Sequence, residues 1–87
     1  MDEEGSEIAQ EAIFEIIENQ IRDGNPPLVR ETLSRLISEG RSREDAMKLI
    51  GCALSVELFE IMKNNETFNS KRYDNNLSKL PELPWDE

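Results

Sequence analysis

The sequence predicts an all-α protein: a small antiparallel helical bundle of three main helices, followed by a short C-terminal helix and an extended tail. Apolar residues recur at three- and four-residue spacing in successive segments, and Gly or Pro residues separate these segments. No stretch alternates apolar and polar residues as a strand would. The connections are short, which favours antiparallel neighbours. With 87 residues the chain forms a single domain over 1–87, within which 1–5 are expected to be a disordered acidic start.

The first helix is expected to begin after Ser6, a suitable N-cap residue, and to end at about Asp23, where Gly24 suits the position after a helix. Its polar side carries an acidic stripe, formed by Glu7, Glu11, Glu15 and Glu18. Its apolar stripe consists of Ala9, Ala12, Ile13, Ile16, Ile17 and Ile21, with Phe14 at the flank.

The second helix is expected from about Pro27 to Glu39, because proline suits the first turn of a helix and Gly40 can end it. It is amphipathic. Its apolar face consists of Val29, Thr32, Leu33, Leu36 and Ile37.

The third helix is expected from about Arg43 to Lys63, with Ser42 and Asp45 forming a capping box and Asn64-Asn65 ending it. Apolar residues surround most of its circumference, which predicts a central position in the bundle. They exceed what three short helices can cover, and the residues nearest its polar side are Cys52, Phe59 and Met62.

A short fourth helix is expected after Asn69, its N-cap, with Phe68 and Tyr73 forming a hydrophobic staple. Its apolar side consists of Tyr73, Leu77 and Leu80. The prolines that follow prevent a continuous helix, so 81–87 is expected to be an extended tail held by Leu83 and Trp85.

Composition argues against several classes of function. The 19 acidic and 10 basic residues give a net charge of −9, which disfavours nucleic acid and anionic membranes as partners. The longest apolar run, Leu49 to Leu54, is far shorter than the ~20 residues of a membrane helix. The lack of His and the single Cys52 leave no multi-Cys zinc site, so neither a metal nor a cofactor is expected. A lone thiol and the acidic start suit the cytoplasm.

Two polar residues fall inside apolar arcs and form the candidate site. Glu57 lies among the apolar residues of the third helix, and Gln20 lies within the apolar arc of the first. Because an unpaired buried carboxylate is costly, we expect Gln20 and Glu57 to meet across the interface of these two helices. Such a contact fixes the register of the helices, or it lines a pocket in which Glu57 acts as a functional carboxylate.

Other charged and nucleophilic residues have structural interpretations beside functional ones. The acidic stripe is a solvated face or, alternatively, a site for a hard cation. The arginines Arg30, Arg35, Arg41 and Arg43 are expected to pair within the chain rather than to bind a phosphate or an acidic partner. Cys52 is expected to be a small buried hydrophobe rather than a nucleophile.

An ordered set of motifs resembles a family of small uncharacterised bacterial all-helical proteins, a domain of unknown function. The similarity covers about residues 10–80. The motifs are Glu18-Asn19-Gln20, Pro26-Pro27, Thr32-Leu33-Ser34-Arg35-Leu36, Ser42-Arg43-Glu44-Asp45-Ala46, Leu54-Ser55-Val56-Glu57-Leu58-Phe59-Glu60 and Phe68-Asn69-Ser70-Lys71-Arg72-Tyr73. The resemblance implies a compact helical domain and no established activity.

The resemblance also bears on metal binding. Some members of that family have two pairs of histidines, each pair four residues apart, that suit a metal. This sequence has Gln10 and Phe14 at the first pair of positions and Glu44 and Lys48 at the second. Because this chain lacks those histidines, the resemblance implies no metal site in it.

Three hypotheses of function follow. The first is a non-catalytic module that binds another protein or itself through the apolar surplus of the third helix. The second is a small-ligand-binding protein or enzyme that uses Glu57 in an inter-helix pocket. The third is an acidic inhibitor that mimics nucleic acid, based on the net charge of −9 and the acidic stripe.

Overall fold

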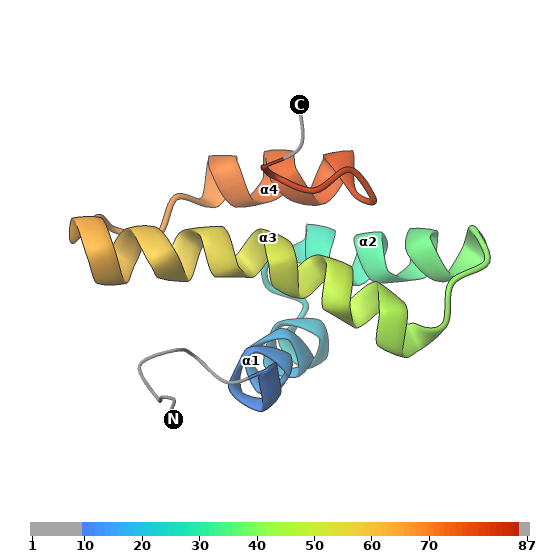
Figure 1. Cartoon of the computed structure of the whole chain (residues 1–87). Coiled ribbons are helices and arrows are strands. Elements are labelled where there is room, and N and C mark those ends of the chain that lie inside the picture. The colour runs from blue at the N-terminus through green and yellow to red at the C-terminus, as the bar shows by residue number, and fades with distance from the viewer. Residues whose placement is uncertain (1–9, 86–87) are drawn as a thin grey trace, which may run out of the picture.

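The computed structural model describes residues 10–85, which form four α-helices and no strand (Figure 1). The helices are α1 (Gln10–Asp23), α2 (Pro27–Ser38), α3 (Arg43–Asn64) and α4 (Ser70–Lys79). Each predicted C-terminal boundary of the first three helices lies within one residue of the observed one. The expected acidic start, the Ser6 cap, Glu7 and Ala9 lie outside the described residues, as do the last two residues of the tail.

Helix α3 lies at the centre of the fold and contacts each of the other three helices. In Figure 1, α4 lies along one side of α3, α1 crosses on the opposite side and is viewed nearly end-on, and α2 lies beside the first half of α3. The central position expected for the third helix is confirmed.

The helix ends follow the capping chemistry that the sequence predicts. The Ser42 hydroxyl accepts a hydrogen bond from the Asp45 backbone N–H at 3.0 Å, and the Asn69 side chain accepts one from the Arg72 N–H at 3.0 Å. Asn65 ends α3 in the left-handed conformation, with φ 57°. The Phe68 and Tyr73 rings meet edge-on with centroids 5.4 Å apart, so the hydrophobic staple also forms.

The core is built around α3 from one apolar face of each neighbour. Gly51 sets the approach of α1, because a Cβ at this position would lie 3.3 Å from Ile13 Cγ2. Two residues of the expected apolar faces are outside: Ala12 of α1 is exposed, and Ile37, one residue before the end of α2, is 40% exposed. The buried apolar residues are Ile17, Val29, Leu33, Leu36, Ala46, Met47, Ile50, Ala53, Leu54, Tyr73, Leu77 and Leu80.

The tail is not extended as predicted but turns back over α4 (Figure 1). The Glu82 N–H donates to the Lys79 carbonyl at 2.9 Å, which closes a turn directly after the helix. Leu80 is buried and Leu83 packs against the core, so burial of these two side chains draws the chain back. Trp85 is more exposed than Leu83, at 58%.

Candidate interaction surface

Glu57 is fully buried between α3 and the start of α4, and both of its carboxylate oxygens accept hydrogen bonds. Oε1 accepts from the Asn69 backbone N–H at 2.9 Å and from Arg72 Nη2 at 3.1 Å. Oε2 accepts from Arg72 Nε at 2.6 Å. The carboxylate therefore holds the first turn of α4 against α3 through both a main-chain and a side-chain donor.

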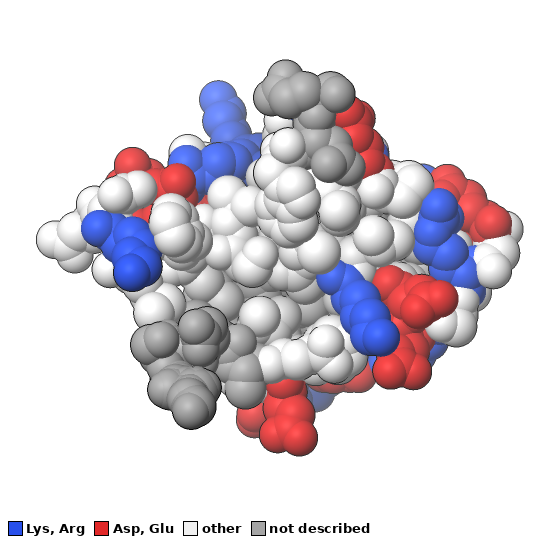
Figure 2. Space-filling model, in the orientation of Figure 1, with Lys and Arg blue, Asp and Glu red and all other residues white. Residues whose placement is uncertain are grey.

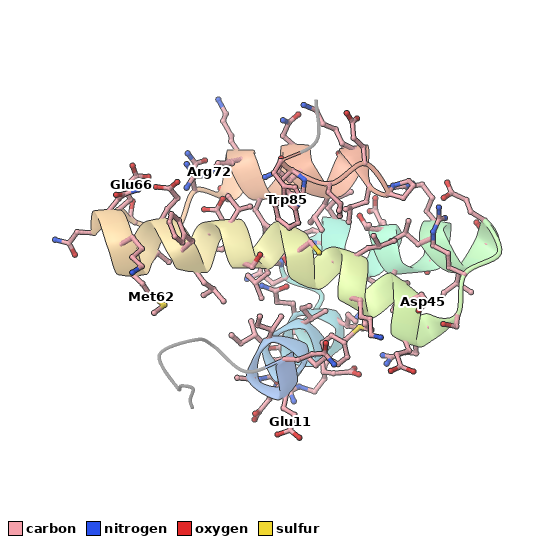
Figure 3. All side chains as sticks on the ribbon, viewed as in Figure 1. Glu11, Asp45, Met62, Glu66, Arg72 and Trp85 are labelled. Atoms are coloured by element: carbon pink, nitrogen blue, oxygen red, sulfur yellow. The ribbon has the colours of Figure 1, made fainter. Side chains whose placement is uncertain are left out.

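Arg72 completes this pair from the surface side. Its side chain is 30% exposed and lies 3.6 Å from Glu66 Oε1 as well (Figure 3). The hydrogen bonds to Glu57 raise the pKa of the Arg72 guanidinium above its already high ordinary value. Arg72 stays charged at any pH at which the protein is folded, so the buried carboxylate always has a cation beside it.

Gln20 and Glu57 do not bind each other, and this expectation is wrong. Gln20 Oε1 accepts a hydrogen bond from the Tyr73 hydroxyl at 2.8 Å. Tyr73 comes from α4, an element whose position the helix spacing alone does not give, and it supplies the donor that Gln20 needs. The two polar residues therefore each bind α4, through adjacent residues of its first turns.

Burial raises the pKa of the Tyr73 hydroxyl above its ordinary value, and the hydrogen bond to Gln20 offsets part of this rise. The negative charges of Asp74 and Glu57 act in the same direction as burial. Tyr73 is thus a neutral donor near neutral pH, and the contact with Gln20 ties α4 to α1.

Among the described residues, no opening to solvent reaches Glu57, because its side chain has no exposed surface and both of its oxygens accept hydrogen bonds. The hollow that the structure contains nearby lies on the outside, is open to solvent and is lined by residues 66–71. Glu57 does not line it. Arg72 is the partner that sequence reasoning missed, although the need of a buried carboxylate for a cation on a packing helix is the signal that could have found it.

The arginine cluster pairs within the chain, as expected. Arg30 donates to the Ile21 carbonyl at the end of α1, and Arg35 donates to the Leu77 and Leu80 carbonyls at the end of α4, at 3.2 and 2.9 Å. These contacts satisfy helix C-terminal carbonyls with a cation. Arg41 binds Glu39 at 2.7 Å, and Arg43 binds both oxygens of Glu18 at 2.7 and 2.9 Å.

The acidic stripe is divided by this last pairing, since Glu18 is held by Arg43 while Glu11 and Glu15 are exposed. Within residues 10–85, no three His, Cys, Asp or Glu side chains converge as metal ligands would. Among these residues, no helix combines the length and apolarity that a bilayer crossing requires.

In the part of the chain that the structure describes, the outward side of α3 presents exposed and partly exposed side chains at a continuous helical spacing. We call the set Cys52, Ser55, Val56, Phe59 and Met62 the α3 face; its members fall on one arc of about 120° at 100° per residue. The first three are partly exposed, and Phe59 and Met62 are each 55% exposed. The Ser55 hydroxyl donates to the Cys52 carbonyl at 2.7 Å, so its polar group is already satisfied.

The α3 face carries no charge. Between Lys48 and Glu60 the only charged residue is Glu57, which is buried on the opposite side of the helix. Figure 2 shows the result: a broad uncharged area over the middle of α3, with Lys, Arg, Asp and Glu around its margin. In Figure 3, Met62 points away from α4 at one end of this helix, while Arg72 and Glu66 lie on the α4 side.

Cys52 lies in the middle of the α3 face and not in the deep core. Its partial burial raises the pKa of the thiol, which lowers the fraction of reactive thiolate at neutral pH. Cys52 is only partly buried, whereas the sequence predicts a small buried hydrophobe.

Comparison with known proteins finds no matching family model, no similar curated protein and no similar solved structure. The resemblance to the small bacterial helical family therefore stays a prediction.

Proposed function

We propose that the protein is a non-catalytic interaction module that binds a helix of a protein partner through the α3 face. The observation that carries this proposal is the uncharged, half-exposed side of α3 between Lys48 and Glu60, in a chain of which 33% of the residues are charged. A surface of this kind on a small acidic protein is a common site of association.

The spacing of the α3 face suits a helix as the partner element. Cys52, Val56 and Phe59 lie at i, i+4 and i+7, which is the periodicity with which one helix packs against another. Burial of the exposed parts of Phe59 and Met62 would supply apolar stabilisation at about 25 cal/mol per Å².

The polar residues support a structural role for the rest of the molecule. Glu57 and Gln20 tie α4 to its neighbours, and the arginines close helix ends or bind surface carboxylates. The alternative role of Glu57 in catalysis or ligand binding is not favoured, because a substrate would first have to displace Arg72 and Asn69. The nucleic-acid mimic is also not favoured, since Glu18 of its acidic stripe is neutralised by Arg43.

The proposal also covers location and relatives. A cytoplasmic location suits a protein whose single thiol needs no oxidising compartment. Membership of the small bacterial helical family, and an antiparallel arrangement of the bundle as a whole, are parts of the same proposal.

The test is affinity capture with tagged full-length protein in its source cell, together with an untagged copy, read by quantitative mass spectrometry. Three baits are compared: the wild type, Phe59→Glu on the α3 face, and Ile37→Glu as a control. Ile37 is matched to Phe59 because it is also an exposed apolar residue, at 40%, but belongs to α2.

We expect Phe59→Glu to lose at least one captured protein, or the untagged copy, that wild type and Ile37→Glu both retain. Circular dichroism of the purified baits checks that each is folded. Identical capture by all three folded baits would contradict the use of the α3 face, and so would capture of nothing by any of them.

A further inference from the structure

The charges that bound the α3 face have a definite order. Asp45 and Lys48 precede the uncharged stretch, and Glu60 and Lys63 follow it. At 100° per residue, these four and Cys52, Val56 and Phe59 fall on one arc of about 120°. Asp45, Lys48 and Lys63 are exposed and Glu60 is partly exposed, so a partner lying along the α3 face would meet all four.

Along the helix the four charges run acid, base, acid, base, so the same series read in reverse places a base opposite each acid. Asp45 and Lys63 are each nine residues from residue 54, and Lys48 and Glu60 are each six residues from it. A second α3 lying antiparallel, with a two-fold axis level with residue 54, would bring Asp45 of each copy opposite Lys63 of the other, because these two residues share one angular position on the helix. Lys48 and Glu60 would lie at one level but on opposite edges of the contact. A parallel copy in register would bring like charges together.

The side chains near that axis are small. Cys52 of one helix would face Val56 of the other, with Ser55 beside them, and residues of this size allow two helices to approach closely. Toward the ends of the contact, Phe59 of each copy would face Leu49 of the other. Leu49 is only partly buried within its own chain, so it presents apolar surface to receive the ring.

The electrostatic balance of the surface also suits a second copy. Two molecules that each carry a net charge of −9 repel one another, and a contact through an acidic side would add local repulsion. The α3 face and its four bounding residues contain two acids and two bases, so together these residues carry no net charge. Within one chain, Lys48 Nζ lies 3.9 Å from Glu44, and Glu60 accepts a hydrogen bond from Asn64 Nδ2.

We infer that the partner of the α3 face is a second copy of this chain, whose α3 packs antiparallel about a two-fold axis beside residue 54. This inference rests on the proposed function, because it names the helix that the α3 face binds. It gives a symmetric dimer in which each α3 acquires a neighbour on its open side.

The first experiment is sedimentation velocity of the full chain over a range of concentrations. We expect a monomer–dimer equilibrium for the wild type and for Ile37→Glu. Phe59→Glu should be a monomer at every concentration at which the wild type is a dimer. Because Phe59 is 55% exposed, this variant should keep the circular-dichroism spectrum of the wild type.

The second experiment tests the orientation with charge reversals. In the antiparallel pair, Asp45→Lys and Lys63→Glu each create two like-charge contacts, and we expect each to raise the dissociation constant of the dimer by about tenfold. The double variant Asp45→Lys/Lys63→Glu restores two opposite-charge contacts and should return to the wild-type constant. Lys71→Glu, which changes an exposed lysine of α4 outside the α3 face, is the matched control and should change little.

The outcomes separate this inference from the proposed function. A monomeric wild type overturns the inference, whereas the function still stands if Phe59→Glu loses another captured protein. A dimer that is insensitive to Phe59→Glu overturns the use of this face by a second copy. Equal dissociation constants for both single variants and the wild type overturn the antiparallel pairing.

Discussion

Two carboxylates in this protein each accept two hydrogen bonds from one arginine of another helix, but they lie in opposite environments. Glu57 joins α3 to α4 through Arg72 and has no exposed surface. Glu18 of α1 binds Arg43 of α3, and these two side chains are 48% and 51% exposed. The geometry of the two pairs is nearly the same, with shortest nitrogen–oxygen distances of 2.6 and 2.7 Å, but their exposure to solvent differs.

The difference shows that burial, rather than geometry, determines how much each pair matters. At the surface, water replaces either partner, so the pair adds little to the free energy of unfolding. In the interior, removal of one partner leaves a charge without solvent or counter-charge, which is far more costly. The pair at Glu57 therefore holds the first turn of α4 against α3, while the pair at Glu18 only supplements the packing of Ile13 and Ile17 against Gly51.

The largest effect is expected from Arg72→Met, which removes the cation and keeps the length of the side chain. The buried Glu57 charge then keeps only the Asn69 N–H as a donor. We expect the melting temperature to fall by about 10–20 °C. Thermal unfolding followed by circular dichroism measures this, and a change of less than a few degrees would show that Glu57 gains no net stabilisation from Arg72.

The double variant Glu57→Leu/Arg72→Met is the control for this prediction, because it buries no charge at all. We expect it to recover more than half of the loss, since an apolar pair of similar size often substitutes for a buried ion pair. A melting temperature that stays below that of the wild type would reflect the Asn69 N–H, which loses its acceptor when Glu57 is replaced. A double variant as unstable as Arg72→Met would instead assign the loss to packing rather than to charge.

An intermediate effect is expected from Tyr73→Phe, which removes the neutral hydrogen bond beside the buried pair. The ring stays in the core, but the hydroxyl no longer donates to Gln20. We expect a loss of about 1 kcal/mol in the free energy of unfolding, measured by urea denaturation, because solvent at the half-buried Gln20 replaces part of the bond.

The same variant tests the raised pKa of Tyr73. The folded protein favours the neutral phenol, so this contribution to stability is complete below about pH 10, the pKa of an unfolded tyrosine. It is lost as the pH rises from there toward the higher pKa of the folded state. The wild type should therefore lose more stability than Tyr73→Phe between pH 9 and about 11. Tyr73 is the only tyrosine, so its phenolate absorbance reports the titration directly.

The helices and their ends could be predicted because they depend on local chemistry. Ser42, Asn65 and Asn69 cap helices through contacts a few residues away, and apolar spacing identifies the central α3. The prediction that Glu57 is buried was also correct, since its place in an apolar arc needs no partner to be recognised.

The partners of the buried polar groups could not be predicted from the same patterns. Gln20 and Glu57 lie on helices that contact each other, yet both bind α4, whose docking depends on the packing of Tyr73 and Leu77. The turn of the tail was missed for a related reason. Proline excludes a helix but leaves open where the chain goes, and the burial of Leu83 decides it.

The smallest effect is expected from Glu18→Gln, which keeps the shape of the side chain and removes the charge that Arg43 binds. The hydrogen bonds from Arg43 lower the pKa of Glu18, with burial opposing them. Its contribution is therefore present above the unfolded pKa of about 4.3 and is lost as the pH falls through the lower pKa of the folded state. Because both side chains are about half exposed, we expect a loss of about 0.5 kcal/mol at pH 7. The difference between wild type and variant should be smaller at pH 3 than at pH 7, and it should shrink at high salt, which screens a surface pair. Urea denaturation at pH 7 and at pH 3 measures the free energy of unfolding of wild type and variant. A loss as large as that of Arg72→Met would show that an exposed ion pair stabilises this protein as much as a buried one.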